Sequence, residues 1–341
     1  MNKSSQDRIN YGLSLLKMLM AFEVLLSHFA SWKEYDPRLV WPFRQLNSLA
    51  VPCFLIISFY LTAHSFRKRD NEKTIDRFKR LLIPQIFWAF IYYIIYAVID
   101  LVLHKGLHSG ISDLFLQLIT GHSRYLNPSM WYQFDLIIVT LLFSILFHYL
   151  DDRKIDIVFI FLLAISYFLQ FSGINHSIFH EMEFEFKYPL GRIVETIPYA
   201  IIGYYLRCFD IFNKLKKYRY FIMIAAVVLF LGGFYVPWPE IDDFGYGGLA
   251  KPYLSLCIIA FAFLAPFEYL NQKTKNMILK ISDYTLGIYC IHRLINTLLQ
   301  VFLPFIALRS IERCVLIYIL SYFICFLLDQ IKNPFIQRSI K

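Results

Sequence analysis

The chain has 341 residues, of which 58% are hydrophobic and 17% are charged. A soluble domain averages roughly 25% charged residues, and one water-soluble core could not hide this much apolar surface. The formal net charge is +9, but the basic residues lie between apolar runs, which is typical of membrane loops rather than of nucleic-acid binding. The composition therefore predicts an integral membrane protein without a nucleic-acid partner.

Apolar runs close to the ~20 residues that a helix needs to cross a bilayer recur along the whole chain. A membrane β-barrel would instead show short alternating segments. We expect one all-α domain over residues 1–341 with about ten transmembrane helices. The predicted spans are roughly 11–31, 46–66, 83–103, 130–150, 155–172, 191–209, 221–237, 250–268, 284–304 and 314–331.

The distribution of Lys and Arg predicts the orientation of these spans. With a cytoplasmic N-terminus, the cytoplasmic segments hold about twice as many Lys and Arg residues as the outer segments, as the positive-inside rule requires. The C-terminus is then also cytoplasmic, because the number of spans is even. The first run contains Glu23 and ends in SHFASW, a poor signal-peptide cleavage site, so we interpret it as an uncleaved span.

The longest outer segment, 104–129, contains the sequence SDLFLQLIT. Leu114, Phe115, Leu118 and Ile119 share one face if this stretch is helical. The pattern predicts a short amphipathic helix on the outer surface, with a plain loop as the alternative.

The six cysteines lie in or beside apolar runs and form no CxxC pair. This placement favours small buried side chains over a disulfide framework or a metal site. The chain also lacks the GxSxG, Walker A and HExxH motifs, so it carries none of the signatures of a serine hydrolase, a P-loop nucleotidase or a zinc protease.

Three ionisable residues lie in the first predicted span: Lys17, Glu23 and His28. The eleven-residue spacing of Lys17 and His28 is three helical turns plus ~20°, so both point to one face and stand ~16 Å apart. Ionisable groups within a span usually face a bundle interior or a wet cavity, and imidazole transfers protons near neutral pH. The pattern indicates either a general base at His28 or two side chains that snorkel to the two interfaces.

Further polar residues lie near the outer ends of later spans. Trp131 and Asp135 begin the fourth span on one helical face, and Asp135 could orient His28. Trp131 also suits an interfacial aromatic belt. Arg192 and Glu195 could form a local i,i+3 pair.

His292 and Arg293 lie in the middle of the ninth predicted span. An arginine at that depth is costly against lipid, so we expect Arg293 to face protein or water. His292 has either a direct role in the reaction or a packing hydrogen bond.

Six segments resemble, in order, the motifs of the membrane acyltransferase family called acyltransferase 3. They are GLSLLKMLMAFEVLLSH (12–28), AVPCFLIISFYLT (50–62), RFKRLLIP (77–84), MWYQFDLI (130–137), IPYAIIGYYLR (197–207) and SDYTLGIYCIHRLI (282–295). Within these segments the chain departs from the family pattern at four positions. Lys17 occupies a position where the family has Arg, Phe59 one where it has Gly, Gln133 one where it has Leu, and Arg293 one where Pro is common.

The resemblance implies a multi-pass enzyme of the bacterial inner membrane, commonly an O-acetyltransferase. Such an enzyme takes an acyl group from cytoplasmic acetyl-CoA or another acyl-CoA, which is a donor substrate rather than a bound cofactor. It passes the group to a hydroxyl of a surface or lipid-linked polysaccharide. His28 matches the essential histidine of the family and would act as the general base or carry the acyl group briefly.

The resemblance also suggests a donor site. Arg77 and Arg80 match the family's basic residues at the entry to the third span, where they would bind the phosphates of CoA. Alternatively, they are ordinary positive-inside anchors. Lys17 is a further candidate for the donor site, or it holds a helix in place.

His292 matches a histidine that is frequent in the ninth span of the family, as an expected contact to substrate. The resemblance further implies that Trp131 and Asp135 could bind a sugar and that Arg192 and Glu195 could line the acceptor cavity.

Two other classes of function fit the same residues. Ten spans with buried ionisable groups also suit a transporter or exporter of polysaccharide or a small metabolite, and relatives of the family are described as exporters. A membrane scaffold without chemistry is the third alternative, in which His28 would be an interfacial anchor.

Overall fold

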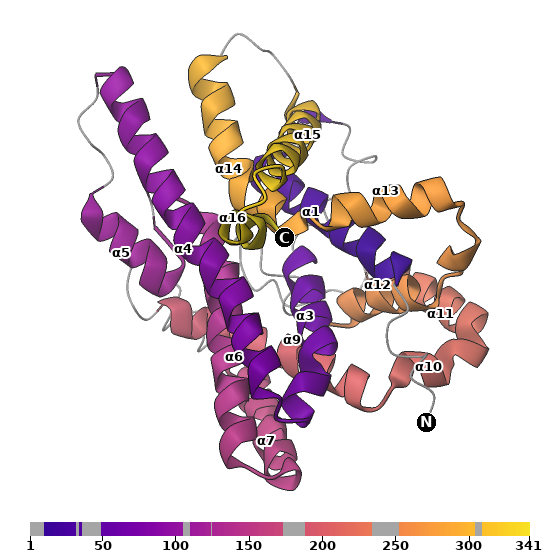
Figure 1. Ribbon diagram of the computed structural model, residues 1–341. Coiled ribbons are helices and arrows are strands. Elements are labelled where there is room, and N and C mark those ends of the chain that lie inside the picture. The colour runs from indigo at the N-terminus through magenta and orange to yellow at the C-terminus, as the bar shows by residue number, and fades with distance from the viewer. Residues whose placement is uncertain are drawn as a thin grey trace.

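The computed structural model describes residues 10–31, 34–35, 49–104, 110–123, 125–172, 188–233, 252–303 and 309–341. These residues form helices and no strand, as the sequence predicts (Figure 1). The longer helices are α1 (Tyr11–Phe29), α3 (Ala50–Arg67), α4 (Asn71–Val102), α5 (Ile111–Thr120), α6 (Trp131–Tyr149), α7 (Asp152–Phe171), α9 (Tyr188–Cys208), α11 (Arg219–Gly233), α12 (Pro252–Leu264), α13 (Gln272–Ser282), α14 (Thr285–Phe302) and α15 (Ser310–Asp329). The short helices are η3 (Pro128–Met130), α10 (Ile211–Leu215), η5 (Lys216–Tyr218), η7 (Phe267–Tyr269) and α16 (Pro334–Ile340).

A helix overlaps each of the ten predicted spans. Five segments of the described residues are long and apolar enough to cross a membrane by themselves, namely α1, α3, α4, Pro128–Tyr149 and α15. The helices at the other five predicted spans are α7, α9, α11, α12 and α14. Among them, α12 has 13 residues, and α14 contains His292 and Arg293. The structure therefore supports a helical membrane protein, and the number of ten spans stays a prediction.

Aromatic side chains fill the contact between α3 and α6, and a glycine brings α9 close to α3. Phe59 is fully buried, with its ring centroid 4.7 Å from that of Phe143, and such pairs add ~0.5–1.5 kcal/mol beyond their buried area. A Cβ atom at Gly203 of α9 would lie only 2.3 Å from the carbonyl oxygen of Ile56. The close helix contact thus depends on Gly203, while a large ring fills position 59.

Gln133 has a structural role at a proline. Pro84 stands inside α4, where its ring interrupts the backbone ladder because it has no N–H and crowds the preceding turn. The buried side chain of Gln133 on α6 donates to the carbonyl oxygen of Leu81 in that turn, at 2.8 Å. This contact gives a reason for glutamine at a position where the family commonly has leucine.

Paired contacts fix the relative directions of six helix pairs. Printed contacts show that α4 runs parallel to α14, through Tyr92–Cys290 and Tyr96–Thr297, and that α6 runs parallel to α9, through Asp135–Arg192 and Phe147–Tyr204. For α1 and α14, His28 contacts Arg293, and Lys17 lies within electrostatic reach of Asp283 just before α14, which is also a parallel arrangement. For α3 and α12, Tyr60 packs on Phe263, and Cys53 lies near Ser255. Antiparallel pairs are fixed by Met18–Tyr318 and Leu25–Cys314 for α1 with α15, and by Arg77–Thr140 and Leu81–Gln133 for α4 with α6. If the ten predicted spans are numbered along the chain, odd-numbered spans run in one direction across the membrane and even-numbered spans in the other. Each of the six helix pairs has the relative direction that this numbering requires.

The predicted helix in 104–129 is present as α5, and two residues of its predicted apolar face are exposed on the surface of the protein. Phe115 and Ile119 are 60% and 49% exposed, whereas Gln117 and Thr120 are buried beside Leu114. The face of α5 that meets α4 is set by a hydrogen bond, because the side chain of Gln85 on α4 donates to the carbonyl of Gln117 at 3.0 Å. A helix that docks through such bonds need not turn its most apolar stripe inward.

Candidate active site

His28 lies in the last turn of α1, where its imidazole meets η3 and α14. Its Nε2 atom lies 3.1 Å from Oγ of Ser129, and its Nδ1 atom lies 3.0 Å from Nη2 of Arg293. Nε of Arg293 donates to the same Ser129 hydroxyl. The side chain of Ser129 is buried, whereas His28 is exposed. Protein groups thus hold both ring nitrogens of an imidazole that remains accessible.

His292 packs against the other side of this site. Its ring stacks on that of His28, with centroids 5.5 Å apart and an angle of 11° between the planes. Nδ1 of His292 lies 2.5 Å from the Tyr289 carbonyl, and it must carry the proton because a carbonyl oxygen only accepts. Nε2 of this buried ring has no hydrogen-bond partner among the described residues. His292 therefore makes the packing hydrogen bond and also contacts the candidate base.

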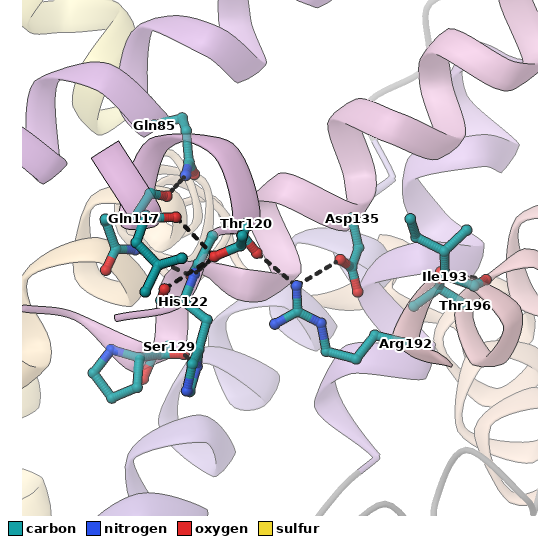
Figure 2. Close-up of polar contacts among 12 residues, drawn as sticks. Gln85, Gln117, Thr120, His122, Ser129, Asp135, Arg192, Ile193 and Thr196 are labelled. Atoms are coloured by element: carbon teal, nitrogen blue, oxygen red, sulfur yellow. Dashed lines mark hydrogen bonds and ion pairs between the residues drawn. The ribbon is translucent and has the colours of Figure 1, made fainter. Parts of the chain in front are cut away.

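Buried amides position the turn that carries Ser129. Oδ1 of Asn127 accepts from the Ser129 N–H at 3.0 Å, and its Nδ2 donates to the Cys290 carbonyl at 3.2 Å. The side chain of Gln117 accepts from the Asn127 N–H at 3.2 Å, and Gln85 binds the Gln117 carbonyl (Figure 2). Three helices, α4, α5 and α14, thus fix η3 beside His28.

Asp135 and Arg192 form a buried ion pair near this turn. The distance from Oδ1 of Asp135 to Nη2 of Arg192 is 3.2 Å, and the two side chains are 0% and 3% exposed. The same Nη2 donates to the Thr120 carbonyl at 2.7 Å, so Arg192 bridges Thr120 and Asp135 (Figure 2). The guanidinium also lies 5.4 Å from the ring centroid of Trp131. Three of the predicted site residues, Trp131, Asp135 and Arg192, therefore lie together.

Asp135 does not orient His28 as predicted, because each of the two side chains contacts other groups. The carboxylate of Asp135 contacts Arg192, and the groups at the nitrogens of His28 are Ser129 and Arg293. The reason is electrostatic, since a buried carboxylate requires a charged or strongly donating partner and the guanidinium provides one.

Glu195 and Lys17 lie apart from the His28 contacts. Glu195 is half-buried one turn beyond Arg192, within electrostatic reach of Tyr199. Lys17 is half-buried near Asp283, at the start of α14. Because α1 is one continuous helix, Lys17 stands ~16 Å from the level of His28.

The side chains of Arg77 and Arg80 lie in different surroundings, although the sequence predicts one shared phosphate site for both. Arg77 turns inward, where it donates to Thr140 Oγ1 and Ser58 Oγ, each at 3.1 Å. Arg80 is 72% exposed and pairs with Asp76 at 2.6 Å. Only Arg80 is therefore open to a soluble ligand, while Arg77 joins α4 to α3 and α6.

His122 lies in the turn between α5 and η3, with Nδ1 3.4 Å from the Pro128 carbonyl. Burial, together with the charges of Arg192 and Arg293, lowers the pKa of His122 to about 4. An unfolded histidine has a pKa near ~6.5, so between these two pH values the unfolded chain binds more protons than the folded one. The contribution of His122 to stability is therefore complete above pH ~6.5 and is lost as the pH falls toward 4.

We accordingly expect acid sensitivity that depends on His122. The free energy of unfolding should fall by up to ~1.4 kcal/mol per pH unit below pH ~6.5 from this residue. Thermal midpoints of the detergent-solubilised protein at pH 7 and pH 5 measure the loss. His122→Gln should reduce the difference between the two midpoints, and an unchanged difference would contradict the assignment.

Several residues of the site gave no clear signal in the sequence. Ser129 is a single serine in a loop, and Tyr289 resembles any other tyrosine of an aromatic-rich span. The pair Asn127-Pro128 is typical of a helix start, which locates η3 but not its function. Arg293 was expected to face protein or water, and its contact with His28 from another helix is visible only in the fold.

Comparison with known proteins shows which family the chain belongs to and which proteins it is similar to. Three similar proteins from Staphylococcus aureus strains MSSA476, MRSA252 and MW2 are each named "Probable poly-beta-1,6-N-acetyl-D-glucosamine export protein". They are 23%, 24% and 23% identical to this chain over 272 residues, which cover 74% of the chain and 70% of each relative. No solved structure matches the chain. The model of the acyltransferase 3 family, described as an acyltransferase domain, matches residues 10–330, and the chain therefore belongs to this family of membrane acyltransferases.

Proposed function

We propose that the protein is an O-acyltransferase, most simply an O-acetyltransferase, that modifies a hydroxyl of a surface or lipid-linked polysaccharide. The observation that carries this proposal is the exposed imidazole of His28, which Ser129 and Arg293 hold at both nitrogens. A sugar hydroxyl has a high pKa and needs a base to attack a thioester. His28 is that base, and acyl-CoA is a substrate rather than a resident cofactor.

The proposed topology is ten spans in the bacterial inner membrane with both termini in the cytoplasm. The helix directions support it, because α1, α4 and α14, which would be spans one, three and nine, run parallel to one another. The Lys and Arg distribution supports the same orientation. His28 then lies toward the outer end of its helix, and the basic turn between α3 and α4 lies at the cytoplasmic end.

The donor phosphates bind, in this proposal, at the turn between α3 and α4. Exposed cations there are Arg67, Lys68, Arg69, Lys73, Lys79 and Arg80. Arginine and lysine both suit phosphate groups. Tyr92 of α4 contacts α14 at the level of His28, and Arg80 lies twelve residues earlier on α4, ~18 Å along the helix. An extended donor, or a relay of the acyl group, must cover that distance.

Arg80 provides a test of the donor site. Arg80→Ala should raise the apparent KM for acyl-CoA several-fold with little change in kcat, because it removes a contact made equally in the ground and transition states. Asp76→Asn should have the opposite effect on KM, since Asp76 pairs with both Arg80 and Arg338. Initial rates in inside-out membrane vesicles measure both values. Unchanged KM in both variants would contradict a phosphate site at this turn.

The acceptor lies, in this proposal, near Trp131, Arg192 and Glu195, with His292 close to the reacting groups. Trp131 is half-buried beside Arg192, and an aromatic face suits the apolar face of a sugar ring. Asp135 is fully buried and supports this site through its ion pair with Arg192.

Polysaccharide export is the second candidate, which the printed names of the relatives favour. The two functions differ in a covalent product. Inside-out vesicles given acyl-CoA with a radiolabelled acyl group should transfer the label to extracted glycan if the protein is an acyltransferase. Movement of unlabelled glycan across the membrane without label incorporation would instead support export.

A further inference from the structure

Hydrogen-bond chemistry determines which nitrogen of His28 carries its proton. A guanidinium has only donors, and Nη2 of Arg293 lies 3.0 Å from Nδ1 of His28. Nδ1 must therefore accept, which leaves the proton of a neutral imidazole on Nε2. Nε2–H then donates to Oγ of Ser129 at 3.1 Å.

The Ser129 hydroxyl agrees with this assignment. Its oxygen accepts from Nε of Arg293 and from Nε2–H of His28, which uses both of its acceptor positions. A doubly protonated imidazole would place a second positive charge ~3 Å from the guanidinium, which is unfavourable at low dielectric. The other charged or titratable group at the ring is His292, whose stacked imidazole holds its own proton on Nδ1.

We propose that Arg293 holds His28 in the Nε2-protonated tautomer, covers its basic Nδ1 until the acyl donor arrives, and then binds the carbonyl group of that donor. The inference rests on the proposed acyl transfer. The carbonyl oxygen of the donor thioester accepts the N–H of Arg293 that otherwise caps Nδ1. The base is thus uncovered only when there is a carbonyl group to attack, which limits futile hydrolysis by water.

In the proposed reaction, acyl transfer and proton transfer take place together at Nδ1 of His28. Nδ1 of His28 takes the proton of the acceptor hydroxyl as the hydroxyl oxygen bonds to the carbonyl carbon of the thioester. The negative charge that develops on the carbonyl oxygen, beside Arg293, offsets the positive charge that the imidazole gains in this step. The carbon–sulfur bond breaks, and the thiolate of CoA takes the proton from Nδ1. The products are an acyl ester and a free thiol, and His28 returns to its Nε2-protonated form.

Two variants and one control test the role of Arg293. Arg293→Met removes every donor at similar length and should lower kcat ~10²–10³-fold, as for loss of a preorganised donor. Arg293→Lys keeps a charged donor and should recover at least tenfold of that loss. Arg153→Gln, which changes an exposed arginine on α7, should leave the rate unchanged. Equal loss in the Met and Lys variants, with normal thermal midpoints, would contradict the proposal.

A spectroscopic measurement tests the tautomer independently of activity. Full-length protein with ¹³C,¹⁵N-labelled histidine in lipid bilayers, compared with His28→Gln, assigns the His28 signals by solid-state NMR through the Cγ–Nδ1 bond. Because Arg293 donates to Nδ1 of His28, we expect an unprotonated Nδ1 in the native protein and a mixture of tautomers in Arg293→Met. A protonated Nδ1 in the native protein would overturn the proposal. If the tautomer is as predicted but no acyl ester forms on any glycan, the proposed function fails while the placement of the proton stands.

Discussion

His28→Ala is expected to lower the rate of acyl transfer by at least ~10²-fold while the protein still inserts and accumulates. Loss of a general base typically costs 10²–10⁴-fold, and the ring of His28 is exposed rather than packed in the core. The released thiol of CoA, measured in vesicles with a polysaccharide acceptor, reports the rate.

The matched control for this variant is His148→Ala. His148 is an exposed histidine in the last turn of α6, outside the contacts of His28. It should keep the native rate. Full activity of His28→Ala, at a protein level equal to that of the control, would exclude His28 as the base.

Asp135→Ala is expected to destabilise the fold strongly, so that little folded protein accumulates in the membrane. The change leaves the guanidinium of Arg192 in a buried site without its carboxylate, and breaking a buried pair in this way typically costs ~3–5 kcal/mol. The yield and the thermal midpoint of detergent-solubilised protein measure the loss.

A surface ion pair provides the comparison for Asp135. Asp152→Ala breaks an exposed pair with Arg69, which is typically worth below ~1 kcal/mol. The double variant Asp135→Leu with Arg192→Leu should recover part of the lost midpoint, since neither charge is then left buried alone. A native midpoint in Asp135→Ala would show that the buried pair contributes little to stability.

The sequence predicts the class of fold because the hydrophobic runs must match bilayer thickness. It also predicts that Lys17 and His28 share a helix face. In the structure His28 contacts Arg293 of α14, and Lys17 lies within electrostatic reach of Asp283, which precedes α14. Such predictions concern a single helix, whose geometry is fixed by its own backbone.

Contacts between helices could not be predicted in the same way. The buried face of α5 follows from its hydrogen bond to Gln85, which lies about thirty residues away in the chain. The separation of Arg77 from Arg80 depends on Ser58 and Thr140 in two other helices. Similarly, the contact of Ser129 with His28 depends on where η3 lies relative to α1. Periodicity identifies the direction of a side chain but not the partner that meets it.

The most direct test of the account is the mass of the surface polysaccharide from cells that carry the native gene, a deletion or His28→Ala. If the protein acylates the polysaccharide with His28 as the base, native cells should show an added acyl mass per modified sugar. This mass should be lost in both other strains, with polysaccharide still present at the surface. Equal polysaccharide mass in all three strains would contradict the account, and if the deletion also retained polysaccharide inside the cell, the protein would be an exporter.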